Sequence, residues 1–333
     1  MSRRQHAVAR ALQKWFADGH RDLPWRRTAD PYRIWLSEIM LQQTRSQTVI
    51  PYYERFLERF PTLEALGAAD EDEVLALWSG LGYYSRARNL RRAARQAVAA
   101  GGFPRDYRGL RELPGIGDYT AAAVASIAFR LPHAVVDGNV LRVISRVQND
   151  PSDISSPRTR ERFREIAQSW LDPTDPGGFN QALMELGATV CLPRNPLCLV
   201  CPLSGLCEAR LAGTAGQLPV KLRQIVPQRV DATVLLIQRR DRILLRRRPQ
   251  SEKKMAGFWE LPSPQDLPDA RAGARLGEVR HTITHHRYRI AVHAGHLPRK
   301  FSCPPGFQWF AGAERAGLPL STIARKAFRL SAN

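Results

Sequence analysis

The sequence of 333 residues has few cysteines, very little lysine and no long apolar segment. Because no run of about 18 apolar residues occurs, no segment is expected to span a bilayer. Lysine accounts for 6 residues against 44 arginines, yet the formal net charge is +19. A GC-rich genome can explain arginine in place of lysine, but it does not explain the positive excess. The charge therefore favours a polyanionic partner such as nucleic acid.

The N-terminal segment, MSRRQHAVARALQKWFADGH, breaks its apolar pattern with Lys14 and Asp18. This pattern predicts an amphipathic helix rather than a signal peptide. We therefore expect a cytoplasmic protein, in which thiols stay reduced and disulfides are disfavoured.

The chain changes texture after Cys207, and this change predicts two domains. Helical patterns dominate residues 1–210, with helices expected at 31–45, 49–60, 71–77, 87–100, 118–129, 138–147, 158–170 and 178–189. Residues 211–228 have no strong period and are interpreted as a linker. Alternating patterns then predict a smaller α/β domain over 229–333, in which VDATVLLIQ and RILLRRR form a hairpin around RRD.

Four of the five cysteines lie in one stretch, CLPRNPLCLVCPLSGLC, with the spacing C-x6-C-x2-C-x5-C. Structural zinc usually takes two C-x2-C pairs, whereas only one is present and no histidine lies within the stretch. Four thiolates on one short loop suit a cubane iron–sulfur cluster. The spacing favours Cys191, Cys198, Cys201 and Cys207 as cluster ligands, with zinc and free thiols as open alternatives.

Two further features allow more than one interpretation. Gly115 and Gly117 precede an expected helix, and such a turn can direct backbone N–H groups at a phosphate, although most such turns serve packing. Asp137 follows the apolar run Ala134–Val136 and precedes Gly138. By position alone, it is either a helix cap or a functional carboxylate.

In combination, the glycine turn, the VVDGNV segment and the cysteine loop resemble the helix–hairpin–helix DNA glycosylases with an iron–sulfur cluster, over residues 10–210. Within that superfamily, LPWR (23–26), PYRIWLSEIMLQQT (31–44) and WSGLGYYSRARNL (78–90) are similar to the MutY-type adenine glycosylases. The resemblance implies a multidomain fold: an all-α glycosylase domain with its cluster loop, then a smaller α/β Nudix-like domain. It also implies one 4Fe-4S cluster, and a bacterial, nucleoid-associated monomer that removes adenine opposite 8-oxoguanine or guanine in double-stranded DNA.

The resemblance assigns the chemistry to Glu38 and Asp137. Glu38 would protonate the leaving adenine, and its apolar neighbours on the helix would raise its pKa, although an exposed carboxylate remains possible. Asp137 would stabilise the sugar cation or trap it as an adduct. Tyr119 and Asn139 would orient the site. Because Tyr119 occupies the position of a lysine in bifunctional relatives, a monofunctional enzyme is expected.

The resemblance also assigns the contacts with DNA. An adenine pocket would be formed by Trp25, Arg26, Leu41 and Gln181, and the wedges at the opposing purine would be Gln43 and Tyr83. The hairpin with Leu113, Gly115 and Gly117 would hold phosphate. The loop with Thr284 and His285 would read 8-oxoguanine.

The segment LLIQRRDRILLRRRPQSEKKMAGFWELP resembles the opening of a Nudix-like domain. The paired glutamates of a Nudix hydrolase do not follow it, so no magnesium pyrophosphatase is expected. The reading loop here is HTITH, in which Ile283 stands in place of the aromatic residue usual in the family. Stacking on a base is thereby lost, while the hydroxyl of Thr284 and the imidazole of His285 remain.

Two other functions stay open at this stage. A bifunctional glycosylase and lyase like endonuclease III is disfavoured by Tyr119 and by the second domain. A non-catalytic DNA-damage-binding protein is disfavoured by the presence of both Glu38 and Asp137.

Overall fold

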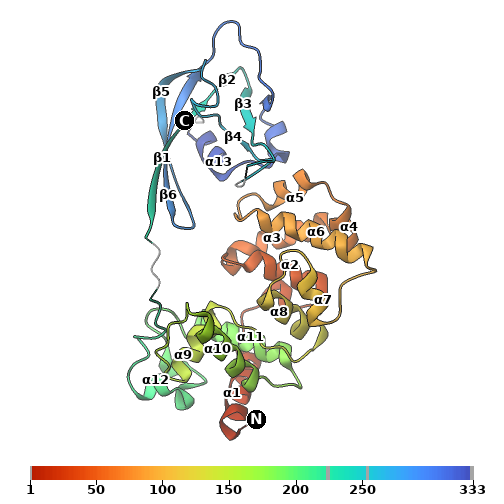
Figure 1. The fold of residues 1–333 in the computed structure, drawn as a ribbon, viewed down its shortest axis with the longest axis vertical. Helices are drawn as coiled ribbons and strands as arrows, with labels where there is room; N and C mark the ends of the chain where they lie inside the picture. Colours follow the sequence, from red (N-terminus) through yellow and green to blue (C-terminus); the bar gives the residue numbers. More distant parts are fainter. Residues whose placement is uncertain (1, 223–225, 253–254, 331–333) are drawn as a thin grey trace. The chain divides into compact units, whose positions relative to one another are not determined.

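The computed structural model describes residues 2–222, 226–252 and 255–330 (Figure 1). The chain divides into two compact units, Met1–Gly67 with Arg92–Gln224 and Ala68–Arg91 with Ile225–Asn333. Residues 68–91 therefore group with the C-terminal part of the chain. The division into domains at 1–210 and 229–333, with a linker between them, remains a prediction.

The first unit is helical. Its elements are α1 (Arg3–Gly19), η1 (Pro24–Arg26), α2 (Pro31–Leu41), α3 (Ser46–Arg59), α4 (Leu63–Ala68), most of α6 (Ser85–Ala99), α7 (Tyr107–Glu112), α8 (Asp118–Phe129), α9 (Gly138–Val147), α10 (Pro157–Trp170), α11 (Pro176–Thr189), η2 (Cys198–Val200), η3 (Ser204–Leu206) and α12 (Glu208–Leu211). The helices predicted from periodicity are present, with ends shifted by a few residues.

Small side chains determine how the helices around α8 pack. Residues 121–125 of α8 are all alanine or valine and are buried, so both α2 and α11 can contact this helix. Helix α2 begins at Pro31, and the Asp30 carboxylate accepts a hydrogen bond of 2.9 Å from the Tyr32 N–H as its cap. Most of α2 is buried, and this burial takes Glu38 into the interior.

The second unit contains two sheets. Its elements are α5 (Glu71–Trp78), the first turns of α6, β1 (Gln228–Leu236), β2 (Gln238–Arg239), β3 (Arg242–Arg247), β4 (Trp259–Glu260), β5 (Arg271–Ile283), β6 (His286–His296), β7 (Phe307–Phe310), η4 (Glu314–Gly317) and α13 (Thr322–Phe328). One sheet has the order β1-β6-β5, with β1 parallel to β6, and in the other β3 pairs with β2, β4 and β7.

The hairpin predicted around RRD is only partly correct. Gln238 and Arg239 pair with β3, whereas β1 pairs with β6 instead. The physical reason is burial on both faces, because Leu235 and Leu236 pack into two different apolar clusters. A simple two-stranded hairpin could not cover both side chains.

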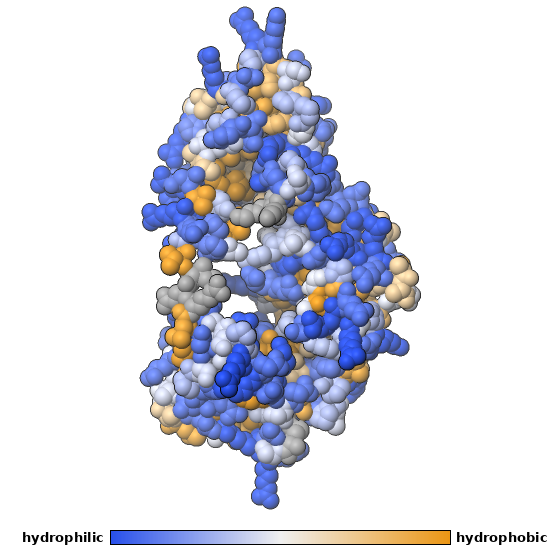
Figure 2. All heavy atoms as spheres, viewed as in Figure 1, coloured by the Kyte–Doolittle hydropathy of each residue, from blue (hydrophilic) through white to orange (hydrophobic). Residues whose placement is uncertain are grey.

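The surface is hydrophilic, as the many charged residues of the sequence predict. The face drawn in Figure 2 is mainly hydrophilic, with apolar side chains in small patches. Among the described residues, no helix has the length and apolarity needed to cross a membrane.

Candidate active site

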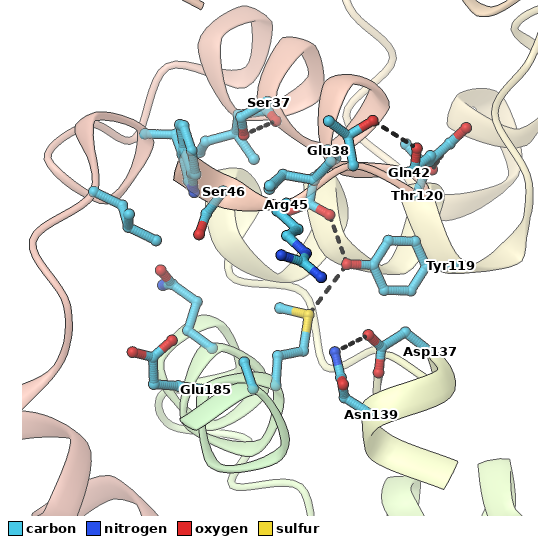
Figure 3. A pocket seen from close by; sticks show the side chains of 18 of the residues that line it. Ser37, Glu38, Gln42, Arg45, Ser46, Tyr119, Thr120, Asp137, Asn139 and Glu185 are labelled. Atoms are coloured by element: carbon cyan, nitrogen blue, oxygen red, sulfur yellow. Dashed lines mark hydrogen bonds between the residues drawn. The ribbon is translucent and has the colours of Figure 1, made fainter. Parts of the chain in front are cut away.

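A cavity of about 1160 Å³ lies in the first unit, between α2, the turn after α2, α8 and α11 (Figure 3). It brings together most of the site residues that the sequence predicts: Trp25, Arg26, Glu38, Leu41, Gln43, Gly117, Tyr119, Asp137, Asn139 and Gln181. These residues span more than 150 positions of the chain, so the fold assembles the site from distant segments.

Glu38 lies on the cavity wall with only 5% of its surface exposed. Burial is the main cause that raises the pKa of Glu38 to about 7, and the hydrogen bond from Tyr119 opposes this rise. The exposed-carboxylate alternative is therefore wrong. A carboxyl with a pKa of about 7 can both hold and release a proton at neutral pH, as a general acid must.

The hydroxyl of Tyr119 lies between two acceptors. It is 2.7 Å from Glu38 Oε2 and 3.1 Å from Met184 Sδ (Figure 3). Because a phenol has one proton, it can donate to only one of them at a time. The ionised carboxylate is the stronger acceptor, and burial raises the pKa of Tyr119 well above its ordinary value. Tyr119 therefore stays neutral and stabilises the anionic form of Glu38.

Asp137 is held at the N-terminus of α9. One of its oxygens accepts from the Val140 N–H at 2.7 Å, and the other accepts from Asn139 Nδ2 at 2.8 Å. Burial raises the pKa of Asp137, while these two hydrogen bonds limit the rise. Asp137 is thus a helix cap as well as a cavity residue. The two interpretations of this residue from the sequence are compatible.

Glu185 on α11 fixes two arginines at the cavity. It lies 2.6 Å from Arg21 Nη2 and 2.8 Å from Arg26 Nη2, and its side chain is 2% exposed. Burial alone would raise the pKa of Glu185, but the hydrogen bonds from Arg21 and Arg26 outweigh it and lower the pKa to about 2. The pair of arginines leaves this wall of the cavity with a net positive charge.

Five predicted DNA contacts lie outside this cavity. Leu113 is 4% exposed and its carbonyl accepts from Ile116, so its side chain supports the hairpin from inside. Gly115 has a φ of 80°, which favours glycine in this turn. Tyr83, Thr284 and His285 all belong to the second unit.

The four cysteines of the loop line a second cavity in the first unit. Burial raises the pKa of the Cys201 thiol to about 11, and the other three cysteines also raise it. Four thiolates would therefore repel one another unless a bound cationic group compensated them, so the donor set fits a metal cluster. Among the described residues, no three His, Cys, Asp or Glu side chains meet at single-ion spacing. The four thiols line one shared space.

A chain of hydrogen bonds connects the cysteine loop to Asp137. Asn139, which donates to Asp137, accepts from Arg142 Nη2 at 2.9 Å. Arg142 Nε in turn donates to the Cys191 carbonyl at 2.8 Å. Arg146 lies nearby and donates to the sulfur of Cys191 at 3.2 Å. The loop thus helps to hold Asn139 and, through it, Asp137.

Sequence reasoning missed Glu185, Arg21, Met184 and Arg142. One local signal could have found Glu185, since it lies four positions after Gln181 and therefore on the same face of α11. Arg142 similarly lies three positions after Asn139 on α9. No local pattern links Arg21 to Glu185, because 164 positions separate them.

Two arginines of the second unit pair with three of its carboxylates. Arg246 pairs with Glu252, Glu260 and Asp266 at 2.8 to 3.1 Å, and Arg248 pairs with Glu260 at 2.9 Å. The negative charges of Glu252, Glu260 and Asp266 are therefore balanced by arginines.

Comparisons with known proteins identify the class to which this chain belongs. Residues 36–169 match the helix–hairpin–helix superfamily of base excision DNA repair proteins, and residues 191–207 match the iron–sulfur binding domain of endonuclease III. Residues 232–330 match the NUDIX domain. A solved thermostable thymine-DNA glycosylase shares 29% identity and covers 63% of this chain and 97% of its own, with a TM-score of 0.58. The chain is therefore a DNA glycosylase with an iron–sulfur cluster and a Nudix-like second part.

The particular family follows from relatives that match over more than two thirds of their length. The adenine DNA glycosylase of Homo sapiens is 36% identical over 96% of this chain and 73% of the relative. That of Buchnera aphidicola (strain Bp) is 38% identical over 73% of this chain and 68% of the relative. The chain belongs to the adenine DNA glycosylase family of base-excision repair.

Proposed function

We propose that this protein removes adenine from adenine·8-oxoguanine and adenine·guanine mispairs in double-stranded DNA, as a monofunctional, monomeric enzyme of the cytoplasm. One observation carries the proposal: Glu38, with a pKa of about 7, and Asp137 line the same cavity of about 1160 Å³. A cavity of this size accommodates an extruded nucleotide.

Glu38 acts as the general acid on the leaving base. Because its pKa is about 7, Glu38 can carry a proton near neutral pH, and a proton delivered to adenine N7 makes the base a better leaving group. Once Glu38 is anionic, the Tyr119 hydroxyl at 2.7 Å stabilises the new charge.

Asp137 provides the negative charge that the sugar needs as the glycosidic bond breaks. The hydrogen bonds from Val140 and Asn139 favour its ionised form and fix its orientation. The anion stabilises the oxocarbenium ion, or joins it as an adduct that water later hydrolyses.

The adenine pocket is formed by Trp25, Arg26, Leu41 and Gln181. Trp25 is packed edge-on against Tyr53 with ring centroids 5.5 Å apart, and Arg26 is held by Glu185. Rigid polar groups of this kind support recognition of one base by its hydrogen-bonding edge.

A monofunctional reaction is supported by the residues at the cavity. Tyr119 cannot form a Schiff base, and no lysine is among the described residues that line the cavity. The product is then an abasic site in an unbroken strand.

The opposing strand and the phosphates are held by further residues, of which Gln43 and Gly117 also line the catalytic cavity. Gln43 and Tyr83 have left-handed backbones, with φ of 58° and 50°, and are exposed, as wedge residues must be. Thr284 and His285 form the two-residue turn between β5 and β6 and read the purine opposite adenine. The turn at Leu113, Gly115 and Gly117 holds phosphate.

The cysteine loop binds one 4Fe-4S cluster through Cys191, Cys198, Cys201 and Cys207. The shared cavity and the match to the iron–sulfur binding domain of endonuclease III support this assignment. When bound, the cluster stabilises the loop and thereby the backbone carbonyl that Arg142 binds.

The test is single-turnover base release from duplexes with adenine opposite 8-oxoguanine, guanine or thymine. We expect release in that order of rate, with strand breaks only after alkali treatment. Breaks without alkali would indicate the glycosylase and lyase alternative, and the absence of release would indicate a binding protein.

A further inference from the structure

The turn between α5 and α6 is held rigidly from inside. Trp78 Nε1 donates to the Gly82 carbonyl at 3.1 Å, and Arg86 Nη2 donates to the carbonyls of Leu81 and Gly82 at 3.3 and 3.2 Å. The Arg86 guanidinium lies 5.4 Å from both the Trp78 and the Tyr83 ring centroids. Tyr83 is thereby displayed on a fixed turn, with 37% of its surface exposed.

Both ends of this turn are anchored on the C-terminal part of the second unit. Ser79 is 2% exposed, and its hydroxyl donates to the Leu320 carbonyl at 2.8 Å. Tyr84, directly after Tyr83, packs on the fully buried Phe258 with ring centroids 4.0 Å apart. We name this contact, formed by Ser79, Tyr84, Phe258 and Leu320, the seam.

Charged contacts extend the seam along α5 and α6. Arg247 on β3 pairs with Asp72 of α5 at 2.5 Å. Arg88 on α6 donates to the Ala256 carbonyl and pairs with Glu71 at 2.9 Å. The segment 68–91 is therefore attached at four separate points.

The seam is continuous with the hairpin that ends in the reading loop. Leu320 and Trp259 belong to one apolar cluster with Val279 of β5 and Ile290 of β6. These two strands pair as far as Ile283 and His286, and the loop Thr284–His285 closes them directly. Leu320, which accepts from Ser79, therefore connects the seam to the cluster that contains both strands of this hairpin.

We propose that the seam is a specificity-determining contact that joins the wedge residue Tyr83 to the body that reads the opposing purine. The inference rests on the proposed function, which assigns Tyr83 as a wedge and His285 as part of the reader. With the seam intact, a purine recognised by the reading loop fixes the position of Tyr83. Recognition of the opposing purine by the reading loop and insertion of Tyr83 into the duplex then occur together. Both are separate from the chemistry at Glu38 and Asp137.

The test is a double-mutant cycle on the full-length protein with its cluster. Single-turnover rates are measured for adenine opposite 8-oxoguanine and opposite guanine, in Ser79→Ala, His285→Ala and the double variant. We expect Ser79→Ala to lower the ratio of the two rates by roughly twofold to tenfold, the range of one buried hydrogen bond. Because both substitutions interrupt the same event, the double variant should lose no more than the worse single variant.

Two further variants provide a second disruption of the seam and a matched control. Phe258→Leu removes the ring contact and should lower the same ratio if Ser79→Ala folds poorly. Ser145→Ala is the matched control, because Ser145 is also fully buried and donates to a backbone carbonyl at 2.8 Å, but in the first unit. It should leave the ratio unchanged.

The possible outcomes distinguish failure of the seam proposal from failure of the proposed reading role of His285. Equal losses on both substrates, or additive losses in the double variant, would show that the seam is only structural. If His285→Ala alone left the ratio unchanged, the reading role itself would be wrong.

Discussion

Replacing Tyr119 with phenylalanine tests the proton balance of the active site. Tyr119→Phe removes the hydrogen bond of 2.7 Å to Glu38 Oε2 and leaves the ring in place. Because that bond favours the anion of Glu38, its loss must raise the pKa of Glu38 above its present value of about 7. A hydrogen bond to a charged group contributes about 1.5–3 kcal/mol, so the pKa should rise by roughly 1 to 2.

The assay is the pH dependence of single-turnover adenine release. A general acid works only while protonated, so the rate of the unaltered enzyme should fall as the pH rises through about 7. In Tyr119→Phe this fall should occur at a higher pH, even if the plateau rate is lower. Met184→Leu is the control, since it removes the other acceptor of the Tyr119 hydroxyl, at 3.1 Å, and should leave the midpoint in place. An unchanged or lower midpoint in Tyr119→Phe would refute the assignment of Glu38 as the acid.

Three other variants test the remaining parts of the site. Asp137→Asn should slow adenine release at least about a hundredfold while duplex binding persists; near-normal release would exclude its role at the sugar. Glu185→Gln leaves Arg21 and Arg26 without their anion and should cost about 3–5 kcal/mol in urea unfolding. Because the pKa of Glu185 is lowered to about 2 from 4.5, this stabilisation should be present above pH 4.5 and vanish as the pH falls through 2, and a pH-independent loss would contradict the ion pair. Arg142→Gln should lower both the iron per chain, measured by absorbance and metal analysis, and the release rate; full iron with a normal rate would show that its bonds to Cys191 and Asn139 are dispensable.

Local sequence patterns predicted the residues whose roles depend on nearby neighbours. Glu38 was assigned by the family resemblance, and its apolar helix neighbours Ile34, Trp35 and Leu41 favoured burial over an exposed carboxylate; it is 5% exposed. Asp137 was recognised as a possible cap from the glycine after it, and it does cap α9. The longer helices of residues 1–210 followed from periodicity, because helical patterns are local.

Pairings between distant segments could not be predicted in this way. The sequence gives no sign that Glu185 pairs with Arg21 and Arg26, or that β1 pairs with β6 rather than β3. Each depends on which surfaces meet after the helices and strands have formed. The grouping of residues 68–91 with the C-terminal part of the chain has the same origin, since no property of that segment alone identifies its partner.

The seam also has a consequence for the order of folding during synthesis. Ser79 and Leu320 are 241 positions apart, so Ser79 leaves the ribosome long before its partner exists. At about 5–20 residues per second, the segment 68–91 waits roughly 10 to 50 s for the C-terminal residues. During that interval the hydroxyl of Ser79 lacks its Leu320 acceptor, and until Phe258 is made the Tyr84 ring lacks the ring on which it packs. A nascent chain that ends before Phe258 would therefore leave the Tyr84 ring without this contact, and chaperone binding or proteolysis at 68–91 would reveal it.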